Sequence, residues 1–180
     1  MFKFVCRICG GSEYTPVGAA FRCDTCSAHF SSPESFTLPK VKFIKLDENA
    51  IEPNRAKDGD VGYDAISIMD VVIAPRNTVM VKTGISVQLP PNTEMQVRAR
   101  SGMAKKYGIM VINGPGTIDT GYRGPCNVLL HNTSDIEYVV EKGNAIAQFL
   151  VTPKLPYIFT EVDQLDDTDR GSGGFGHTGK

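Results

Sequence analysis

No charge of either sign dominates this sequence. Its 19 Lys and Arg residues stand against 20 Asp and Glu residues, which gives a formal net charge of −1. A chain without a net positive field is not drawn to polyanions, so non-specific binding to nucleic acid is disfavoured. Long apolar runs are also missing: none approaches the ~18 residues of a membrane span, and the start of the chain has no secretory signal. These absences predict a cytoplasmic protein with no membrane partner.

Long amphipathic helices are a third feature that the sequence lacks. Alternating α/β enzymes, including those with dinucleotide-binding folds, need recurring helices and are therefore excluded. The sequence instead alternates apolar and polar residues with period 2, as at 78–82, 94–98 and 136–140. Gly or Pro interrupts this pattern about every 8 to 12 residues, which is typical of a sandwich or barrel. We therefore expect an all-β fold in which only residues 101–107 form a helix.

The chain of 180 residues is long enough for one full domain with a small appendage, and 41% of its residues are apolar. We expect three parts. Residues 1–38 contain most of the cysteines, and residues 39–160 form the β domain. Residues 161–180 turn acidic and then glycine-rich, so we expect a flexible arm that orders when something binds it.

Four of the five cysteines form two CxxC pairs. They are Cys6, Cys9, Cys23 and Cys26, whereas Cys126 stands alone and is expected to be a buried core thiol. Each CxxC turn presents two thiolates to one ion, and two turns complete a tetrahedral Zn²⁺ site. Four cysteine ligands leave no position for water, so this zinc is expected to be structural, in a small zinc ribbon. His29 is expected to be solvated or packed rather than a ligand.

The zinc-ribbon-like module is not expected to bind DNA. Its side chains sum to zero charge, and four thiolates with one Zn²⁺ bring it to about −2, which repels a phosphate backbone. A protein partner or a role in oligomer stability is the favoured interpretation.

Five short segments carry residues with evident chemistry. They are residues 62–64, 100–104, 113–124, 143–148 and 170–176. Arg100, Ser101 and Gly102 open the expected helix, where a guanidinium, a hydroxyl and backbone N–H groups can hold phosphate oxygens, although an ordinary helix cap explains them equally well. Asp119 lies in a glycine-rich hairpin and suits a general base, but a turn-capping aspartate is the simpler alternative for that residue alone.

In this order and spacing, the five segments resemble the five motifs of the homotrimeric dUTP pyrophosphatase (dUTPase) family, over residues 41–180. The resemblance implies a jelly-roll-like β-barrel or sandwich, assembled as a homotrimer with active sites shared between subunits. It also implies Mg²⁺-dependent hydrolysis of dUTP to dUMP and pyrophosphate, by attack of water at the α-phosphate. Two departures from the family pattern are Asn144-Ala145 and His177, where a charged residue and a serine are usual.

The resemblance assigns a role to each matching residue. Asp119 is expected to be the general base, Asp64 to hold the Mg²⁺ complex through water, and Tyr122 to pack against the deoxyribose. The residues expected to read the uracil are Asn113, Thr117, Ile118 and Asn127, and those expected to hold the phosphates are Arg100, Ser101, Gly102 and Gln148. From the arm, Arg170 is expected to pair with the γ-phosphate and Phe175, followed by Gly176, to close over the uracil.

Two other functions are alternatives to this one. A dCTP deaminase of related fold needs a glutamate ten residues after Asp119, but Leu129 stands there and cannot transfer a proton. A regulatory protein that keeps the fold and acts through its zinc ribbon is the non-enzymatic alternative. Intact Asp119, Tyr122 and Arg170 favour the enzyme.

Overall fold

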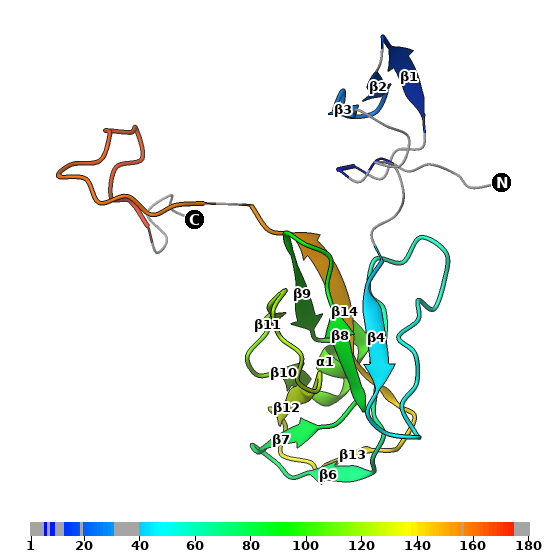
Figure 1. The fold of residues 1–180 in the computed structure, drawn as a ribbon. Coiled ribbons are helices and arrows are strands. Elements are labelled where there is room, and N and C mark those ends of the chain that lie inside the picture. The colour runs from blue at the N-terminus through cyan, green and yellow to red at the C-terminus, as the bar shows by residue number, and fades with distance from the viewer. Residues whose placement is uncertain are drawn as a thin grey trace.

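The computed structural model describes residues 6, 8, 9, 13–18, 20–30, 40–155 and 157–174 of the chain. Two separate β structures are visible in Figure 1, a small N-terminal sheet and a larger β domain. The N-terminal sheet contains β1 (Tyr14–Val17), β2 (Ala20–Cys23) and β3 (His29–Phe30), all antiparallel. The expected small sheet around the CxxC pairs is therefore present.

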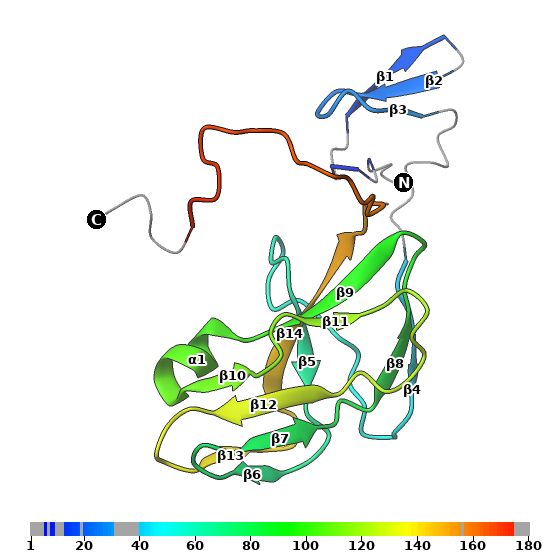
Figure 2. The same cartoon turned by 90° about the vertical axis from the view of Figure 1, so that its left-hand side faces the viewer.

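The β domain contains eleven of the strands in the described residues and one helix. The strands are β4 (Lys42–Lys45), β5 (Tyr63–Ile66), β6 (Val71–Ile73), β7 (Thr78–Val81), β8 (Ile85–Gln88), β9 (Thr93–Arg98), β10 (Ile109–Val111), β11 (Gly116–Ile118), β12 (Val128–Asn132), β13 (Tyr138–Val140) and β14 (Ala145–Pro153). They form a four-stranded sheet in the order β11-β9-β14-β5, a three-stranded sheet β10-β12-β7 and two strand pairs (Figure 2). The prediction of an all-β fold with one short helix is confirmed.

Alternation along the strands produces the core. In β9, Met95 and Val97 are buried while Gln96 and Arg98 are more exposed, as the period-2 pattern predicted. Val81, Leu130 and Ile146 are almost completely inaccessible to solvent, and together they belong to one continuous apolar cluster of the β domain. The N-terminal sheet has a separate and much smaller buried cluster of Cys6, Cys23 and Phe30.

The only helix of the described residues, α1 (Ser101–Tyr107), has the predicted bounds. Met103 anchors it to the core. It ends at Gly108, whose φ of 66° is left-handed and whose N–H donates to the carbonyl of Ala104. A Cβ atom at Gly108 would lie 2.7 Å from Oγ1 of Thr133, so glycine is required there for space as well as conformation.

One expected strand is shorter than the pattern predicted. Residues 136–140 were expected to be extended, but β13 begins at Tyr138. The preceding residues form a turn, because the Asn132 amide and the Ser134 hydroxyl both donate to the carbonyl of Ile136, at 2.7 and 2.9 Å. Polar side chains in this turn compete with the sheet for the backbone groups.

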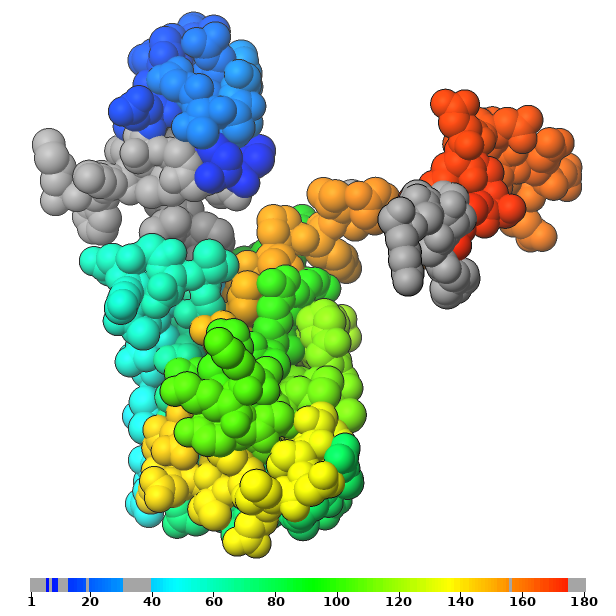
Figure 3. All heavy atoms as spheres, turned by 180° about the vertical axis from the view of Figure 1, so that it is seen from behind, coloured from blue at the N-terminus to red at the C-terminus, as the bar shows by residue number. Residues whose placement is uncertain are grey.

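The C-terminal part leaves the β domain after β14. Residues 157–174 contain neither helix nor strand, and Figure 3 shows this segment, coloured orange to red, standing away from the domain. Tyr157, Ile158 and Phe159 are 79%, 89% and 102% exposed, so one chain alone leaves this apolar segment uncovered. Within the described residues, no helix has the length and apolar character needed to cross a membrane.

Candidate active site

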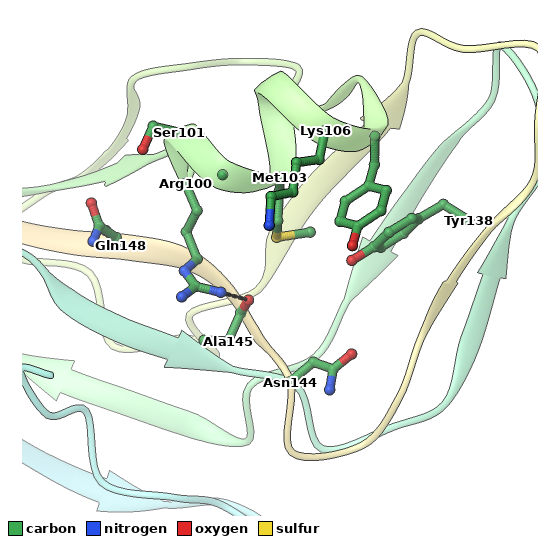
Figure 4. A pocket seen from close by; sticks show the side chains of 10 residues that line it. Arg100, Ser101, Met103, Lys106, Tyr138, Asn144, Ala145 and Gln148 are labelled. Atoms are coloured by element: carbon green, nitrogen blue, oxygen red, sulfur yellow. Dashed lines mark hydrogen bonds between the residues drawn. The ribbon is translucent and has the colours of Figure 1, made fainter.

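One cavity lies between α1 and the start of β14 and has a volume of about 420 Å³, larger than the two described below. Four predicted phosphate-binding residues line it, namely Arg100, Ser101, Gly102 and Gln148. The other residues that line it are Met103, Lys106, Tyr107, Tyr138, Asn144 and Ala145. Figure 4 shows Arg100, Met103 and Lys106 extending from the helix side toward β14. Residues from two of the five sequence segments therefore meet in one space.

Arg100 links these segments to a third. Its Nε lies 3.5 Å from Oδ1 of Asp64, and its Nη1 donates to the carbonyl of Ala145 at 2.7 Å, the bond dashed in Figure 4. Asp64 lies in β5, opposite Gln148 of the neighbouring strand β14. The carboxylate of Asp64 is only 15% exposed. The ion pair thus holds an acidic group beside residues that line the cavity.

Gly62 matters through its contact with Gln148. A Cβ atom at position 62 would lie 3.0 Å from the side-chain Cδ of Gln148 and 3.1 Å from its Oε1. A larger residue would push this amide away from its place in the cavity. The close contact with Gln148 therefore explains why glycine stands at position 62, which the sequence pattern did not.

The glycine-rich hairpin around β11 forms a second cavity of about 180 Å³. Six residues predicted for the nucleoside and the reacting water line it together: Asn113, Thr117, Ile118, Asp119, Tyr122 and Asn127. The carboxylate of Asp119 stands exposed directly after β11. An adjoining cavity of about 240 Å³ shares Asn113, Tyr122 and Asn127 and is also lined by Leu129.

A tight turn sets Tyr122 beside Asp119. The backbone N–H of Tyr122 donates to the carbonyl of Asp119 at 3.0 Å, and the Tyr122 hydroxyl donates to the carbonyl of Pro125 at 3.2 Å. A Cβ atom at Gly124 would collide with the Tyr122 hydroxyl. Glycine at position 124 therefore leaves room for the Tyr122 ring to lie close to the backbone of this turn.

The chain that follows the turn is tied to the core. The Ser86 hydroxyl donates to the carbonyl of Arg123 at 2.7 Å, and the Thr83 hydroxyl donates to that of Cys126 at 2.6 Å. Cys126 is buried, as predicted, and burial raises the pKa of its thiol to about 11. These bonds give the hairpin a rigid base, which a site that orients a substrate requires.

The two groups of residues do not share a cavity within one chain. Arg100 and Gln148 line the larger cavity, whereas Asp119 and Tyr122 line the smaller one, and none of these three cavities of the described residues includes both groups. A single chain therefore presents two separate groups of residues, which we call the phosphate half and the nucleoside half after the roles that the sequence predicted for them.

The arm is described only in part. The Nε of Arg170 donates to the carbonyl of Gly173 at 3.0 Å, and the residue is exposed. Phe175, Gly176 and His177 lie outside the described residues. The roles expected for them stay predictions.

The four N-terminal cysteines converge. Their Sγ atoms all lie within 4.8 Å of one another, with 3.7 Å between Cys6 and Cys26 and 3.5 Å between Cys9 and Cys23. His29 lies in β3 with its side chain exposed and is not part of this cluster, in agreement with the prediction.

Sequence reasoning missed Lys106, Tyr107 and Tyr138 in the larger cavity. The two tyrosine rings lie 5.0 Å apart, and burial, together with the neighbouring Tyr107, raises the pKa of Tyr138. Lys106 follows Gly102 by four residues, a spacing that puts both on one face of the helix and that the sequence alone offered as a signal. Nothing in the sequence indicates that Tyr138 lies in this cavity, because only the fold brings it next to the helix.

Comparisons with known proteins agree with this geometry. The family model for dUTPase matches residues 48–179. The deoxyuridine 5'-triphosphate nucleotidohydrolase of Crocosphaera subtropica is 49% identical over 140 residues, which cover 78% of this chain and 99% of that protein. The protein of the same name from Clostridioides difficile is 49% identical over 139 residues, covering 77% and 97%.

The fold has a close counterpart among solved structures. The dUTPase of Staphylococcus bacteriophage 80alpha with dUPNHPP is similar at a TM-score of 0.72 and 27% identity, covering 78% of this chain and 99% of that one. The β fold and these comparisons thus define a class of nucleotide-hydrolysing proteins. Within that class, the chain belongs to the dUTPase family.

Proposed function

We propose that the chain hydrolyses dUTP to dUMP and pyrophosphate by attack of water at the α-phosphate, with Asp119 as the general base. Hydrolysis of dUTP is the activity of the family to which the chain belongs. The observation that carries the mechanism is the cavity that gathers Asp119 with Tyr122, Asn113 and Asn127. A carboxylate beside a nucleoside-sized hollow can position and deprotonate one water.

The reaction balances with these residues. The Asp119 carboxylate accepts a proton from water, and the water oxygen forms a bond to the α-phosphorus. The bond from that phosphorus to the oxygen bridging to the β-phosphate breaks, and pyrophosphate leaves with the electron pair. Tyr122 packs against the deoxyribose, and this contact leaves no room for a 2'-hydroxyl.

The phosphates bind in the larger cavity. Ser101, Gly102 and Gln148 contact the phosphate oxygens, while Arg100 holds the cavity in shape through Asp64 and Ala145. Lys106 adds a cation to the same wall. We propose that Arg170 joins the γ-phosphate when the arm closes, with Phe175 stacking on the uracil and Gly176 behind it.

Mg²⁺ is the metal that we propose for hydrolysis. Hard oxygen ligands suit this ion, which keeps much of its water shell and is often held by one or two carboxylates and substrate phosphates. Asp64 offers such a carboxylate beside the phosphate cavity. Bound Mg²⁺ neutralises charge on the triphosphate, and Asp64 orients the complex through water. Zn²⁺ at the four cysteines is the second metal that we propose, and it has no part in hydrolysis.

We further propose that the active chain is a homotrimer in which the phosphate half of one copy meets the nucleoside half of another. The separation of the two halves in one chain and the uncovered apolar segment after β14 support this. A second copy can bury both. The boundaries proposed for the parts are 1–38, 39–160 and 161–180, supported by a family match that begins at residue 48.

Complementation tests the shared site. The variant Asp119→Asn damages only the nucleoside half, and the double variant Ser101→Ala/Gln148→Ala damages only the phosphate half. Co-assembled chains contain interfaces at which both halves are intact, so the mixture should regain activity that neither variant has. If subunit exchange is verified by mass spectrometry and activity stays absent, each site lies within one chain.

Isotope labelling tests the point of attack. In water enriched in ¹⁸O, attack at the α-phosphate places the label in dUMP. Label found in pyrophosphate would show attack at the β-phosphate and contradict the proposal.

Deamination of dCTP is the enzymatic alternative, and one observation disfavours it. Leu129 lines the cavity beside Asn113 and Tyr122, where an apolar side chain offers no proton for attack at an amino-bearing carbon. A cluster of four thiols is typical of a reducing compartment and supports the expected cytoplasmic location.

A further inference from the structure

We infer that one Zn²⁺ bound by Cys6, Cys9, Cys23 and Cys26 folds the N-terminal sheet as a unit of its own, and that dUTP hydrolysis does not require this unit. The first claim stands on the cysteine geometry alone. The second rests on the proposed function.

The sulfur positions fit a tetrahedral zinc site. With about 2.3 Å from zinc to each thiolate sulfur, the edges of a tetrahedron measure about 3.8 Å. The observed Sγ separations of 3.7 Å and 3.5 Å are close to this length, and all four atoms lie within 4.8 Å of one another. The same separations are far longer than the ~2.05 Å of a disulfide bond, and the structure forms no disulfide among the five cysteines, all of which are described.

The fold brings the two cysteine pairs together through a short hairpin. Strands β1 and β2 pair antiparallel with Tyr14 opposite Cys23, which returns the chain to the first pair. A turn after β2 then places Cys26, because the N–H of Ser27 donates to the carbonyl of Cys23 and the N–H of Cys23 donates to that of Ala28, both at 2.8 Å. Four side chains held so closely as thiolates need a cation among them.

The described residues of this unit bury little apolar surface. Their buried cluster holds Cys6, Cys23 and Phe30, and the described side chains that pack against it are Tyr14, Phe21 and Ala28. Phe30 is the single large apolar side chain that the described residues of the unit bury. Units of fewer than about 40 residues usually need a metal or disulfides. Metal binding is therefore expected to supply most of the folding free energy.

The unit is separate from the dUTPase domain in sequence and in packing. None of its described strands pairs with a strand of the domain, and its buried cluster is distinct from the core of the domain. The family match begins at residue 48, and the Crocosphaera subtropica relative is covered over 99% of its length by 140 residues. A complete dUTPase of that family thus exists without a counterpart of this unit.

Metal content of the purified full chain is the first test. We expect one zinc per chain by mass spectrometry of the metal, in protein purified under reducing conditions. Replacement by Co²⁺ should give the visible absorption of a tetrahedral thiolate site. A metal-free chain, with no uptake of added Zn²⁺ or Co²⁺, would overturn the assignment, as would a mass showing two disulfides.

Variants separate the metal from the reaction. The double variant Cys9→Ser/Cys26→Ser changes the two exposed sulfurs, so it should lose zinc and leave the N-terminal sheet open to protease. The control variant His29→Ala should keep one zinc. Both should hydrolyse dUTP within about twofold of the parent chain. Loss of activity in a variant that is still folded and assembled would show that the unit contributes to the site, whereas inactivity of the parent chain would contradict the proposed function and leave the zinc result intact.

Thiol counting covers the case in which the double variant does not fold. In the parent chain, zinc should protect the four cluster thiols and burial should protect Cys126, so no thiol should react fast with an aromatic disulfide reagent. Chelation should expose four reactive thiols per chain, and denaturant a fifth. Four fast thiols before chelation would overturn the zinc site.

Discussion

The guanidinium of Arg100 lies 3.5 Å from the carboxylate of Asp64 and donates a 2.7 Å hydrogen bond to the carbonyl of Ala145. One side chain therefore joins the start of α1 to β5 and β14. Before any substrate arrives, it sets the shape of the phosphate cavity and holds the carboxylate that we assign to the Mg²⁺ complex.

Replacing Arg100 by lysine should lower kcat/KM for dUTP. Lysine keeps the charge but cannot make both contacts from one planar group. We expect a fall of roughly 10- to 100-fold, because hydrogen bonds to charged groups contribute about 1.5–3 kcal/mol. Arg76→Lys is the matched control: Arg76 pairs with Asp135 at 2.9 Å on the surface, with both side chains exposed, and should retain parent activity. Equal kinetics of the two variants would contradict the role of Arg100.

Asp119→Asn should keep nucleotide binding and lose turnover. The amide cannot accept the proton from water, so we expect kcat to fall by about 10²–10⁴-fold, the usual range for a general base. Steady-state rates and dUTP affinity by calorimetry check this together. Asp163→Asn, in the exposed C-terminal segment, is the control. A rate for Asp119→Asn within tenfold of the parent would refute the base assignment.

Gly124→Ala should disturb the nucleoside half, although Gly124 itself does not line either of its cavities. The new Cβ would collide with the Tyr122 hydroxyl and displace the ring. Because a misplacement of about 1 Å can cost on the order of 10²-fold, kcat/KM for dUTP should fall by at least roughly tenfold, and discrimination against UTP should weaken. Gly121→Ala is the control, since its Cβ meets nothing within 4 Å. The account of the turn fails if both variants behave alike.

Truncation after Asp169 should leave the fold and assembly intact but remove most activity. The missing residues include Arg170 and Phe175, which we expect to act only after the substrate binds. Light scattering and rate measurements on the shortened chain decide the matter. A chain ending at Gly176 keeps both residues and should retain much more activity. Full activity after the longer truncation would exclude a catalytic arm.

Local patterns in the sequence were enough for much of the fold. The period-2 pattern at 78–82 and 94–98 predicted β7 and β9, and the one helix expected, at 101–107, is α1. The pattern at 136–140 was misleading, because Asn132 and Ser134 hold a turn there through bonds that alternation does not report. Element type follows local periodicity, whereas its ends depend on particular hydrogen bonds.

The candidate site was predictable as a set of residues but not as an arrangement. The motif order pointed to Asp64, Arg100, Asp119 and Tyr122. It did not indicate that Arg100 lines one cavity of the chain while Asp119 and Tyr122 line another. The contacts that shape these cavities join distant residues, as Gly62 with Gln148 and Arg100 with Asp64. Such contacts arise from strand register, which a single sequence does not specify.

The central claim is that this chain is a dUTP-specific pyrophosphohydrolase, and its most direct test is pyrophosphate release from four nucleotides under identical conditions. With Mg²⁺ present, we expect fast release from dUTP and rates lower by orders of magnitude for dCTP, dTTP and UTP, because we propose that the cavity around Asn113, Thr117 and Tyr122 binds uracil and deoxyribose. Comparable rates for all four nucleotides, or ammonia release from dCTP, would contradict the account.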